Sequence, residues 1–235
     1  MEVQRSQGNS GNEIIDRICE KIDSGEINLV AIDGPPGIGK TTLIAQVIHY
    51  LAMRNMPYCV VGTDDDCIER DQRDGLELLS FHTGEIVRRV INAHVDPRFP
   101  NGASLDFKRY SSKTGKRDEP HSYNVPGSKG VLIVEGVRSS EHTLDVMADY
   151  RSEVLRRCLF VLLEKSGELV EMQRLERDMN AKGLAESVVM ERIASQRDHL
   201  SYYFGLLRKR LHNAGDFEVG RYNRDARIHV GTITK

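Results

Sequence analysis

Four short stretches of the chain are almost entirely apolar and rich in β-branched residues. They are residues 27–33 (INLVAID), 58–61 (YCVV), 131–137 (VLIVEGV) and 158–163 (CLFVLL). A strand with one face in water alternates apolar and polar residues, whereas a strand buried on both faces is a continuous apolar run. The pattern therefore predicts strands of a parallel sheet with helices covering both of its faces.

Helical patterns separate these predicted strands. They span residues 13–23, 40–54, 84–95, 167–182 and 186–212. Strands that alternate with helices are typical of βαβ units, in which helical crossovers join parallel strands. We therefore expect an α/β fold of three layers, with a mostly parallel central sheet and helices on both faces.

Three segments lie outside this alternation, within a length of 235 residues that suits a single domain spanning 1–235. Residues 1–12 form a polar tail. Residues 96–130 are rich in Pro, Gly, Ser, Lys and Asp, and this predicts a substrate-side insertion or a partly disordered loop. The segment 202–235 matches no pattern, although its Tyr202-Tyr203-Phe204 cluster favours core or interface packing over a base-stacking surface.

The strongest local signal is the segment Gly34-Pro35-Pro36-Gly37-Ile38-Gly39-Lys40-Thr41, which matches the pattern GxxxxGK[ST] between a predicted strand and a predicted helix. Glycines let backbone N–H groups approach phosphate oxygens, and the helix N-terminus adds partial positive charge. We expect Lys40 to reach the β- and γ-phosphates and the Thr41 hydroxyl to bind Mg²⁺. The predicted nucleotide-binding residues are Gly34, Gly37, Ile38, Gly39, Lys40, Thr41 and Thr42.

This loop by itself leaves several functions open. The alternative is a chance match to the motif in a surface turn, which the flanking strand and helix disfavour. Kinases, GTPases, ATP-driven machines and nucleotide-gated switches all remain compatible with the loop alone.

Two further predicted strands end in carboxylates, at the sheet edge where ligands bind in open α/β folds. Asp64, the first acid of Asp64-Asp65-Asp66, is the best candidate for a general base toward a substrate hydroxyl, or it holds Mg²⁺ through water. A solvated turn with a helix-capping Asp is the alternative. Glu135 closes an apolar strand and is predicted to coordinate Mg²⁺ or to hold the substrate, with a surface position as its alternative.

Two arginines in the helical stretch 167–182 are candidates for transition-state stabilisation. Arg174 and Arg177 lie three residues apart on one helix face, and Lys182-Gly183 follows. Phosphoryl transfer gathers negative charge on the moving group, and cations carried by a mobile segment can stabilise it. We expect a helical lid at about 170–185, with a solvated, ion-paired helix face as the alternative.

Composition excludes several classes of protein. Lys+Arg 33 against Asp+Glu 35 gives a formal charge of −2, which disfavours nucleic-acid and membrane-surface partners. The four cysteines lack metal-like spacing, and no apolar run approaches the roughly 20 residues that span a bilayer. We therefore expect a cytoplasmic protein whose partner is a small molecule. A homo-oligomer is conceivable, and His82 and His121 receive no predicted role.

Taken together, these segments resemble the uridine kinase and phosphoribulokinase group of P-loop small-molecule kinases. The resemblance runs from about Asn28 to Gly183 and rests on five segments in the same order. They are the strand and phosphate loop Ala31–Thr42, the acidic segment Val61–Asp65, the acceptor-side hairpin segments Leu105–Phe107 and Tyr110–Arg117, the Glu-Gly strand Val131–Val137, and the pattern Arg174–Asp178 with Lys182-Gly183.

The resemblance implies a P-loop NTPase fold and roles for individual residues. It implies that Asp64 is the catalytic base, with Asp106, Tyr110 and Arg117 meeting the acceptor. The sequence departs from the group at Asp66-Cys67, where an aromatic pair usually follows the catalytic Asp, and at Ser111, where an acid is expected. Because both departures lie on the acceptor side, they affect the expected identity of the substrate more than the expected type of reaction.

The sequence thus predicts an ATP- and Mg²⁺-dependent phosphotransferase that acts on a hydroxyl group of a small molecule. The expected acceptor is a nucleoside such as uridine or cytidine, or another sugar-bearing metabolite. The main alternative is a nucleotide-dependent ATPase switch or a regulatory ATP-binding protein. An NKxD-type guanine motif is lacking, which disfavours a GTPase, and the balanced charge disfavours a polynucleotide kinase.

Overall fold

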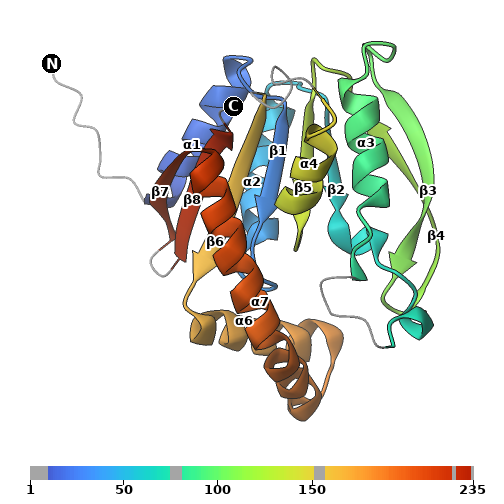
Figure 1. The fold of residues 1–235 in the computed structure, drawn as a ribbon, viewed down its shortest axis with the longest axis vertical. Coiled ribbons are helices and arrows are strands. Elements are labelled where there is room, and N and C mark those ends of the chain that lie inside the picture. Colours follow the sequence, from blue (N-terminus) through green and yellow to red (C-terminus); the bar gives the residue numbers. More distant parts are fainter. Residues whose placement is uncertain (1–9, 75–80, 151–156, 224–225, 234–235) are drawn as a thin grey trace, which may run out of the picture.

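A computed structural model describes residues 10–74, 81–150, 157–223 and 226–233. In these ranges the main sheet has six strands in the order β2-β5-β1-β6-β8-β7, and a separate pair of strands, β3 and β4, lies beside it (Figure 1). The strands of the main sheet are β1 (Leu29–Asp33), β2 (Tyr58–Gly62), β5 (Val131–Glu135), β6 (Cys158–Lys165), β7 (Gly215–Asn223) and β8 (Ala226–Ile233).

The centre of the sheet is parallel. Strand β1 pairs with β5 on one side and with β6 on the other, with Leu29 opposite both Leu132 and Cys158, and β2 extends the parallel pairing beyond β5. Every residue of β1 is buried, as are the first four of β5 and the first six of β6. Three of the four apolar runs therefore form strands covered on both faces, and the fourth forms the edge strand β2, in which buried residues alternate with more exposed ones. The parallel pairing of all four confirms the predicted parallel sheet.

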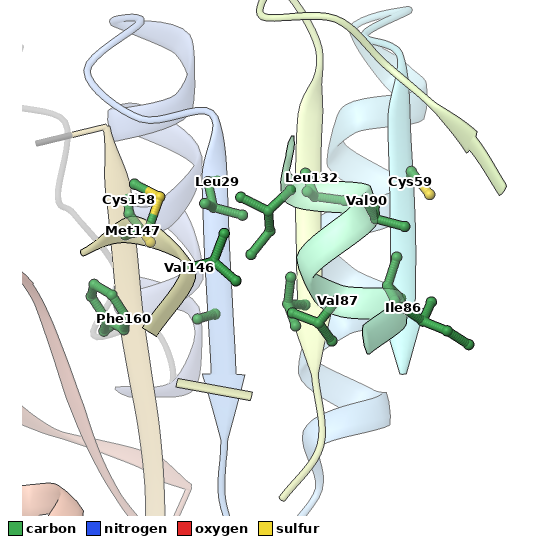
Figure 2. Packing of buried hydrophobic residues seen from close by; sticks show 14 of the residues in the cluster. Leu29, Cys59, Ile86, Val87, Val90, Leu132, Val146, Met147, Cys158 and Phe160 are labelled. Carbon is green, nitrogen blue, oxygen red and sulfur yellow. The ribbon is translucent and has the colours of Figure 1, made fainter. Parts of the chain in front are cut away.

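Helices cover both faces of this sheet and complete a three-layer α/β fold. Alternate residues of β1 face opposite layers, because Leu29 and Ala31 pack with one buried cluster while Val30 and Ile32 pack with the other. Figure 2 shows part of the first cluster, in which Val87 and Val146 come from the helices over the sheet and Phe160 from strand β6. The helices on this face are α3 (Glu85–Val95), α4 (Ser139–Met147) and α7 (Glu186–Ala214), and those on the opposite face are α1 (Ser10–Asp23) and α2 (Lys40–Met53).

The remaining helix of the carboxyl-terminal half, α6 (Gly167–Lys182), follows β6 and lies at the carboxyl end of the strands (Figure 1). Helix α4 was not anticipated from the sequence pattern. Residues 10–12 of the predicted polar tail belong to α1, and residues 1–9 lie outside the described ranges. In the described part of the chain, every helix lacks either the length or the apolar character that a membrane span requires.

The predicted insertion at 96–130 is an ordered hairpin. Strands β3 (Ala103–Ser111) and β4 (Lys116–Val125) pair antiparallel, and the hairpin lies along α3 at the edge of the molecule (Figure 1). Its inner face is anchored in the core by buried Phe107, Tyr123 and Val125. The alternative of a partly disordered loop is wrong for these residues, because their inward-facing apolar side chains supply the burial that an ordered hairpin needs.

The carboxyl-terminal segment, for which the sequence suggested no structure, adds two strands to the sheet. Strand β8 pairs antiparallel with β6, and β7 pairs antiparallel with β8. Tyr203 and Phe204 on α7 are buried in the core, which confirms the packing role predicted for this cluster, whereas Tyr202 is exposed. The sheet is therefore mostly parallel at its centre and antiparallel at this edge.

Removing a fully buried aromatic side chain of the sheet tests this assignment of the core. Phe160 on β6 is completely buried, so we expect Phe160→Ala to lower the free energy of unfolding by about 3–5 kcal/mol, measured by urea denaturation. Tyr202→Ala is the matched control, because that ring is exposed and its loss should cost less than about 0.5 kcal/mol. Equal effects of the two substitutions would contradict the assignment.

Candidate nucleotide-binding and transfer site

The phosphate loop connects β1 to α2, so both flanking elements of the motif are present. Gly37 and Gly39 have φ angles of 87° and 104°, in the left-handed region that residues with a side chain rarely adopt. The loop leads directly into α2, which begins at Lys40 and turns its N-terminus toward the loop. The Lys40 ammonium donates hydrogen bonds to the carbonyl oxygens of Gly34 (2.7 Å) and Pro35 (3.2 Å). It therefore lies against the loop that is predicted to bind the phosphates.

Charged groups from separate strands surround Lys40. Burial lowers the pKa of the Lys40 ammonium, whereas the charges of Glu135, Asp33 and Asp64 act in the opposite direction. Glu135 is the last residue of β5, and Asp64 follows β2 in the short 3-10 helix η1 (Thr63–Asp66). The carboxyl ends of three adjacent parallel strands thus bring these groups together, as the sequence predicted for Asp64 and Glu135.

The three consecutive acids after β2 have three different environments. Asp66 is buried and accepts hydrogen bonds from the Thr83 hydroxyl (2.7 Å) and the Ile86 amide (2.8 Å). Asp65 accepts a hydrogen bond from the Tyr123 hydroxyl of the hairpin. The Asp64 side chain is 86% exposed at the same edge. Asp64 is therefore the acid of the three that is most accessible to a substrate.

The Glu135 side chain lies beside a glycine, Gly62, on the neighbouring strand. It pairs opposite Gly62 on β2, and a Cβ atom at Gly62 would lie 3.4 Å from the Glu135 carboxylate. Burial raises the pKa of Glu135, and the Lys40 charge opposes this shift. The sequence predicts that the Thr41 hydroxyl, Asp64 and Glu135 bind Mg²⁺, and their oxygen atoms are of the type that this ion prefers.

Helix α6 packs directly against the phosphate loop. A Cβ atom at Gly37 would lie 3.4 Å from the backbone of Arg174. Arg174 is buried, its Nε lies 3.9 Å from the Asp178 carboxylate, and burial lowers the pKa of its guanidinium. Arg177 donates a 2.8 Å hydrogen bond to Asp178 and its side chain is 43% exposed. The predicted arginine pair thus belongs to a helix in contact with the loop, with Arg174 packed more deeply.

The three residues predicted to meet the acceptor are not brought together. Asp106 lies on the exposed face of the hairpin, where it accepts a 2.6 Å hydrogen bond from Ser122. The Tyr110 ring stacks with the Arg73 guanidinium, 4.6 Å from the ring centroid. Arg117 donates a 2.9 Å hydrogen bond to buried Asp66 and so ties the hairpin to the body of the protein.

The inner face of the hairpin carries polar groups that the sequence analysis missed. Arg109 lies 4.0 Å from the Asp65 carboxylate, and Tyr123 bonds to the same acid. Side chains alternate along a strand, so the apolar Phe107 places its neighbour Asp106 on the outer face and Arg109 on the inner one. The alternation of apolar and polar residues along this strand was therefore the sequence signal that separates the inward-facing positions from the outward-facing ones.

A second missed residue is Asp33, the last residue of β1. Its buried carboxylate accepts hydrogen bonds from the Gly34 amide (2.9 Å), the Ser140 amide (3.1 Å) and the Tyr203 hydroxyl (3.1 Å). Burial raises the pKa of Asp33 to about 6, although these hydrogen bonds oppose the shift. One carboxylate thus joins the first residue of the phosphate loop to α4 and α7.

A cavity of about 590 Å³ lies on the other side of the phosphate loop. Its walls come from the loop, the end of β6, α6 and α7, and they include Pro35, Pro36, Lys165, Arg174, Phe204 and Gly205. In the sheet, β6 lies next to β1 on the side away from β5 and β2. The phosphate loop therefore separates this cavity from the acidic groups Asp64 and Glu135.

Comparisons with known proteins agree with this fold. The NB-ARC domain family matches residues 11–61, a segment that contains the phosphate loop but less than half of the chain. A comparison with curated proteins found no match. The chain is similar to the crystal structure of a putative fructose transport system kinase from Silicibacter sp. TM1040, with 19% identity and a TM-score of 0.54 over 78% of this chain and 88% of that one.

Two further solved structures are similar to the chain. D-glycerate 3-kinase from Cryptococcus neoformans var. grubii serotype A has 15% identity and a TM-score of 0.53 over 81% of this chain and 88% of that one. A possible uridine kinase from Bacillus stearothermophilus has 22% identity and a TM-score of 0.43 over 54% of this chain and 71% of that one. The sheet, the phosphate loop and the likeness to the structures from Silicibacter and Cryptococcus give the chain a P-loop NTPase fold.

The raised pKa of Asp33 predicts how stability depends on pH. The carboxyl binds a proton more tightly in the folded chain, with a pKa of about 6 against an ordinary 3.8. The stability that this tighter proton binding gives the folded state is therefore present below about pH 4 and is lost as pH rises through 6. We expect the stability of the wild type relative to Asp33→Asn to fall by up to about 3 kcal/mol between pH 4 and pH 7, measured by urea denaturation. A difference that stays constant or rises over this range would contradict the burial of this carboxyl.

Proposed function

We propose that this protein is an ATP- and Mg²⁺-dependent phosphotransferase that phosphorylates a hydroxyl group of a small molecule. The observation that carries the proposal is the arrangement around Lys40. A cation held on the phosphate loop lies next to Asp64 and Glu135, while Arg174 packs against Gly37 from the other side. Phosphoryl transfer needs this combination of positioned cations and an acid beside the acceptor.

On the donor side, the loop amides and Lys40 bind the phosphates. Lys40 donates hydrogen bonds to the carbonyl oxygens of Gly34 and Pro35, so its ammonium lies at the loop that would hold the phosphates. Mg²⁺, when bound, neutralises charge on the β- and γ-phosphates. Thr41 and Glu135 are the residues that hold it, directly or through water.

On the acceptor side, Asp64 orients the hydroxyl and accepts its proton. Asp65 and Asp66 are engaged by Tyr123, Thr83 and Ile86, so the exposed Asp64 is the acid that can approach an acceptor without breaking the hairpin contacts. Glu135 either completes the metal shell or contacts the acceptor. Arg174 and Arg177 stabilise the charge on the phosphoryl group in transfer, with Arg177 leaving Asp178 to do so.

The cavity between the phosphate loop and α7 takes the nucleoside part of ATP. It lies on the side of the loop away from Asp64, so donor and acceptor approach the transferred group from opposite sides, as in-line transfer requires. Its volume of about 590 Å³ is within the range of small-molecule sites.

The acceptor class is a nucleoside or another sugar-bearing metabolite. Support comes from the likeness in fold to the putative fructose transport system kinase and the D-glycerate 3-kinase described above. The test couples ADP release to a panel of nucleosides, pentose phosphates, pantothenate, amino sugars, fructose and D-glycerate. Turnover that one acceptor stimulates supports the transferase, whereas ATP hydrolysis that no acceptor stimulates would favour a nucleotide-dependent switch.

Replacing the proposed base tests the acceptor side. We expect Asp64→Asn to lower kcat by about 10²–10⁴-fold, because the hydroxyl loses its proton acceptor, while ATP affinity stays nearly unchanged. Asp71→Asn is the matched control, since Asp71 is an exposed acid in the next short helix, η2 (Arg70–Gln72). Wild-type turnover in Asp64→Asn would overturn the base assignment.

Filling the cavity tests the donor side. A side chain at Gly205 would enter open space, and we expect Gly205→Phe to raise the KM for ATP by about tenfold, equivalent to about 1.4 kcal/mol of binding, while kcat stays close to the wild type. Gly205→Ala is the control, because its methyl group meets no atom within 4 Å. An unchanged KM for ATP in Gly205→Phe would exclude this cavity as the nucleoside site.

A further inference from the structure

Three metal-ligating side chains meet beside the acidic edge of the sheet. Asp64, Cys67 and His82 each offer one ligand atom, and the three atoms lie within 4.8 Å of one another. Asp64 and Cys67 follow β2, while His82 precedes α3, so two segments of the chain supply the cluster. Cys67 is buried and the His82 side chain is 11% exposed, which leaves Asp64 as the accessible member.

The backbone holds Cys67 and His82 face to face. The two residues form an antiparallel bridge, flanked by hydrogen bonds from the Ile68 amide to Phe81 (2.9 Å) and from the Thr83 amide to Asp66 (3.2 Å). Those bonds belong to the neighbouring residues, so Cys67 and His82 are a non-hydrogen-bonded pair. In such a pair the side chains approach most closely. The geometry of the cluster is therefore set by the backbone.

The distances between the ligand atoms suit a small tetrahedral shell. The Cys67 sulfur lies 3.4 Å from His82 Nδ1, and the same nitrogen lies 3.9 Å from the Asp64 carboxylate. Bond lengths of about 2.3 Å to sulfur and about 2.0 Å to nitrogen or oxygen place tetrahedral ligands about 3.5 Å apart. An adjustment of the exposed Asp64 side chain is enough to complete the shell.

One ring nitrogen of His82 faces three polar groups. His82 Nδ1 also lies 3.1 Å from the carbonyl oxygen of Thr63, so it faces a carbonyl acceptor, a thiol that can donate or accept, and a carboxylate. A cation shared by the cluster would satisfy the sulfur, the nitrogen and the carboxylate together.

We propose that Asp64, Cys67 and His82 form a site for Zn²⁺ or a similar borderline-soft transition-metal ion, distinct from the Mg²⁺ site of the phosphate loop. Thiolate and imidazole ligands select zinc, whereas Mg²⁺ takes oxygen ligands. The Cys67 thiol releases its proton to solvent when the metal binds, and water completes the shell. Because Asp64 is shared, a metal in this site withdraws the carboxylate from the acceptor; this consequence rests on the proposed function.

Cobalt spectroscopy on the full, reduced chain tests the site without any need for turnover. We expect Co²⁺ to give a thiolate charge-transfer band and the visible bands of tetrahedral coordination, which Zn²⁺ abolishes and excess Mg²⁺ leaves intact. Cys67→Ser and His82→Gln should each weaken Zn²⁺ binding by at least about 100-fold. Asp64→Asn should weaken binding but retain the thiolate band, because sulfur and nitrogen remain.

Cys59→Ser is the matched control, since Cys59 is another buried free thiol, on β2. It should keep the full spectrum. The absence of a thiolate band in the wild type, a band that survives in Cys67→Ser, or displacement of Co²⁺ by Mg²⁺ would each overturn the proposed site.

A second measurement separates this site from the proposed kinase activity. We expect stoichiometric Zn²⁺ to inhibit acceptor phosphorylation in the wild type and not in Cys67→Ser, at saturating Mg²⁺. A cobalt spectrum in a protein that phosphorylates no acceptor would leave the metal site standing and defeat the proposed function. Phosphorylation that Zn²⁺ inhibits equally in the wild type and in Cys67→Ser would overturn the link between this site and Asp64.

Discussion

The parallel register of β1, β2 and β5 is the constraint on which the candidate site depends. Parallel strands end at the same edge of a sheet, so residues more than a hundred positions apart in the chain arrive side by side. The pairing places three charged residues at this edge: Lys40 after β1, Asp64 after β2 and Glu135 at the end of β5. The buried apolar faces of the same strands hold that register, since a slip of one residue would turn each strand's core side chains to the opposite layer.

A single buried carboxylate connects this edge to the helical layers. Asp33 accepts hydrogen bonds from the phosphate loop, from the start of α4 and from Tyr203 of α7. A buried carboxylate without partners is strongly destabilising, so its three donors must be in place together. The position of the phosphate loop is thereby coupled to α7, which also lines the cavity proposed for the nucleoside.

Neighbouring acids acquire separate roles through their tertiary surroundings. Asp65 bonds the hairpin through Tyr123, Asp66 joins α3 and Arg117, and Asp64 remains exposed beside His82 and Cys67. The hairpin thus uses two of the three acids as anchors, and the third stays exposed. At Asp66-Cys67 the sequence departs from the kinase group that it resembles, and there Asp66 anchors the hairpin while Cys67 lines the proposed metal cluster.

Local patterns in the sequence were enough to predict the four parallel strands, the phosphate loop and the residues adjacent to strand ends, because continuous apolar runs and glycine spacing act over a few residues. They also predicted that Lys40, Asp64 and Glu135 would converge, since strand ends of a parallel sheet share an edge. Tertiary structure decided the antiparallel pairing of β7 and β8, the hydrogen bond between Arg117 and Asp66, and the burial of Asp33. Each of these depends on a partner distant in sequence, and only the folded chain determines which partner each side chain meets.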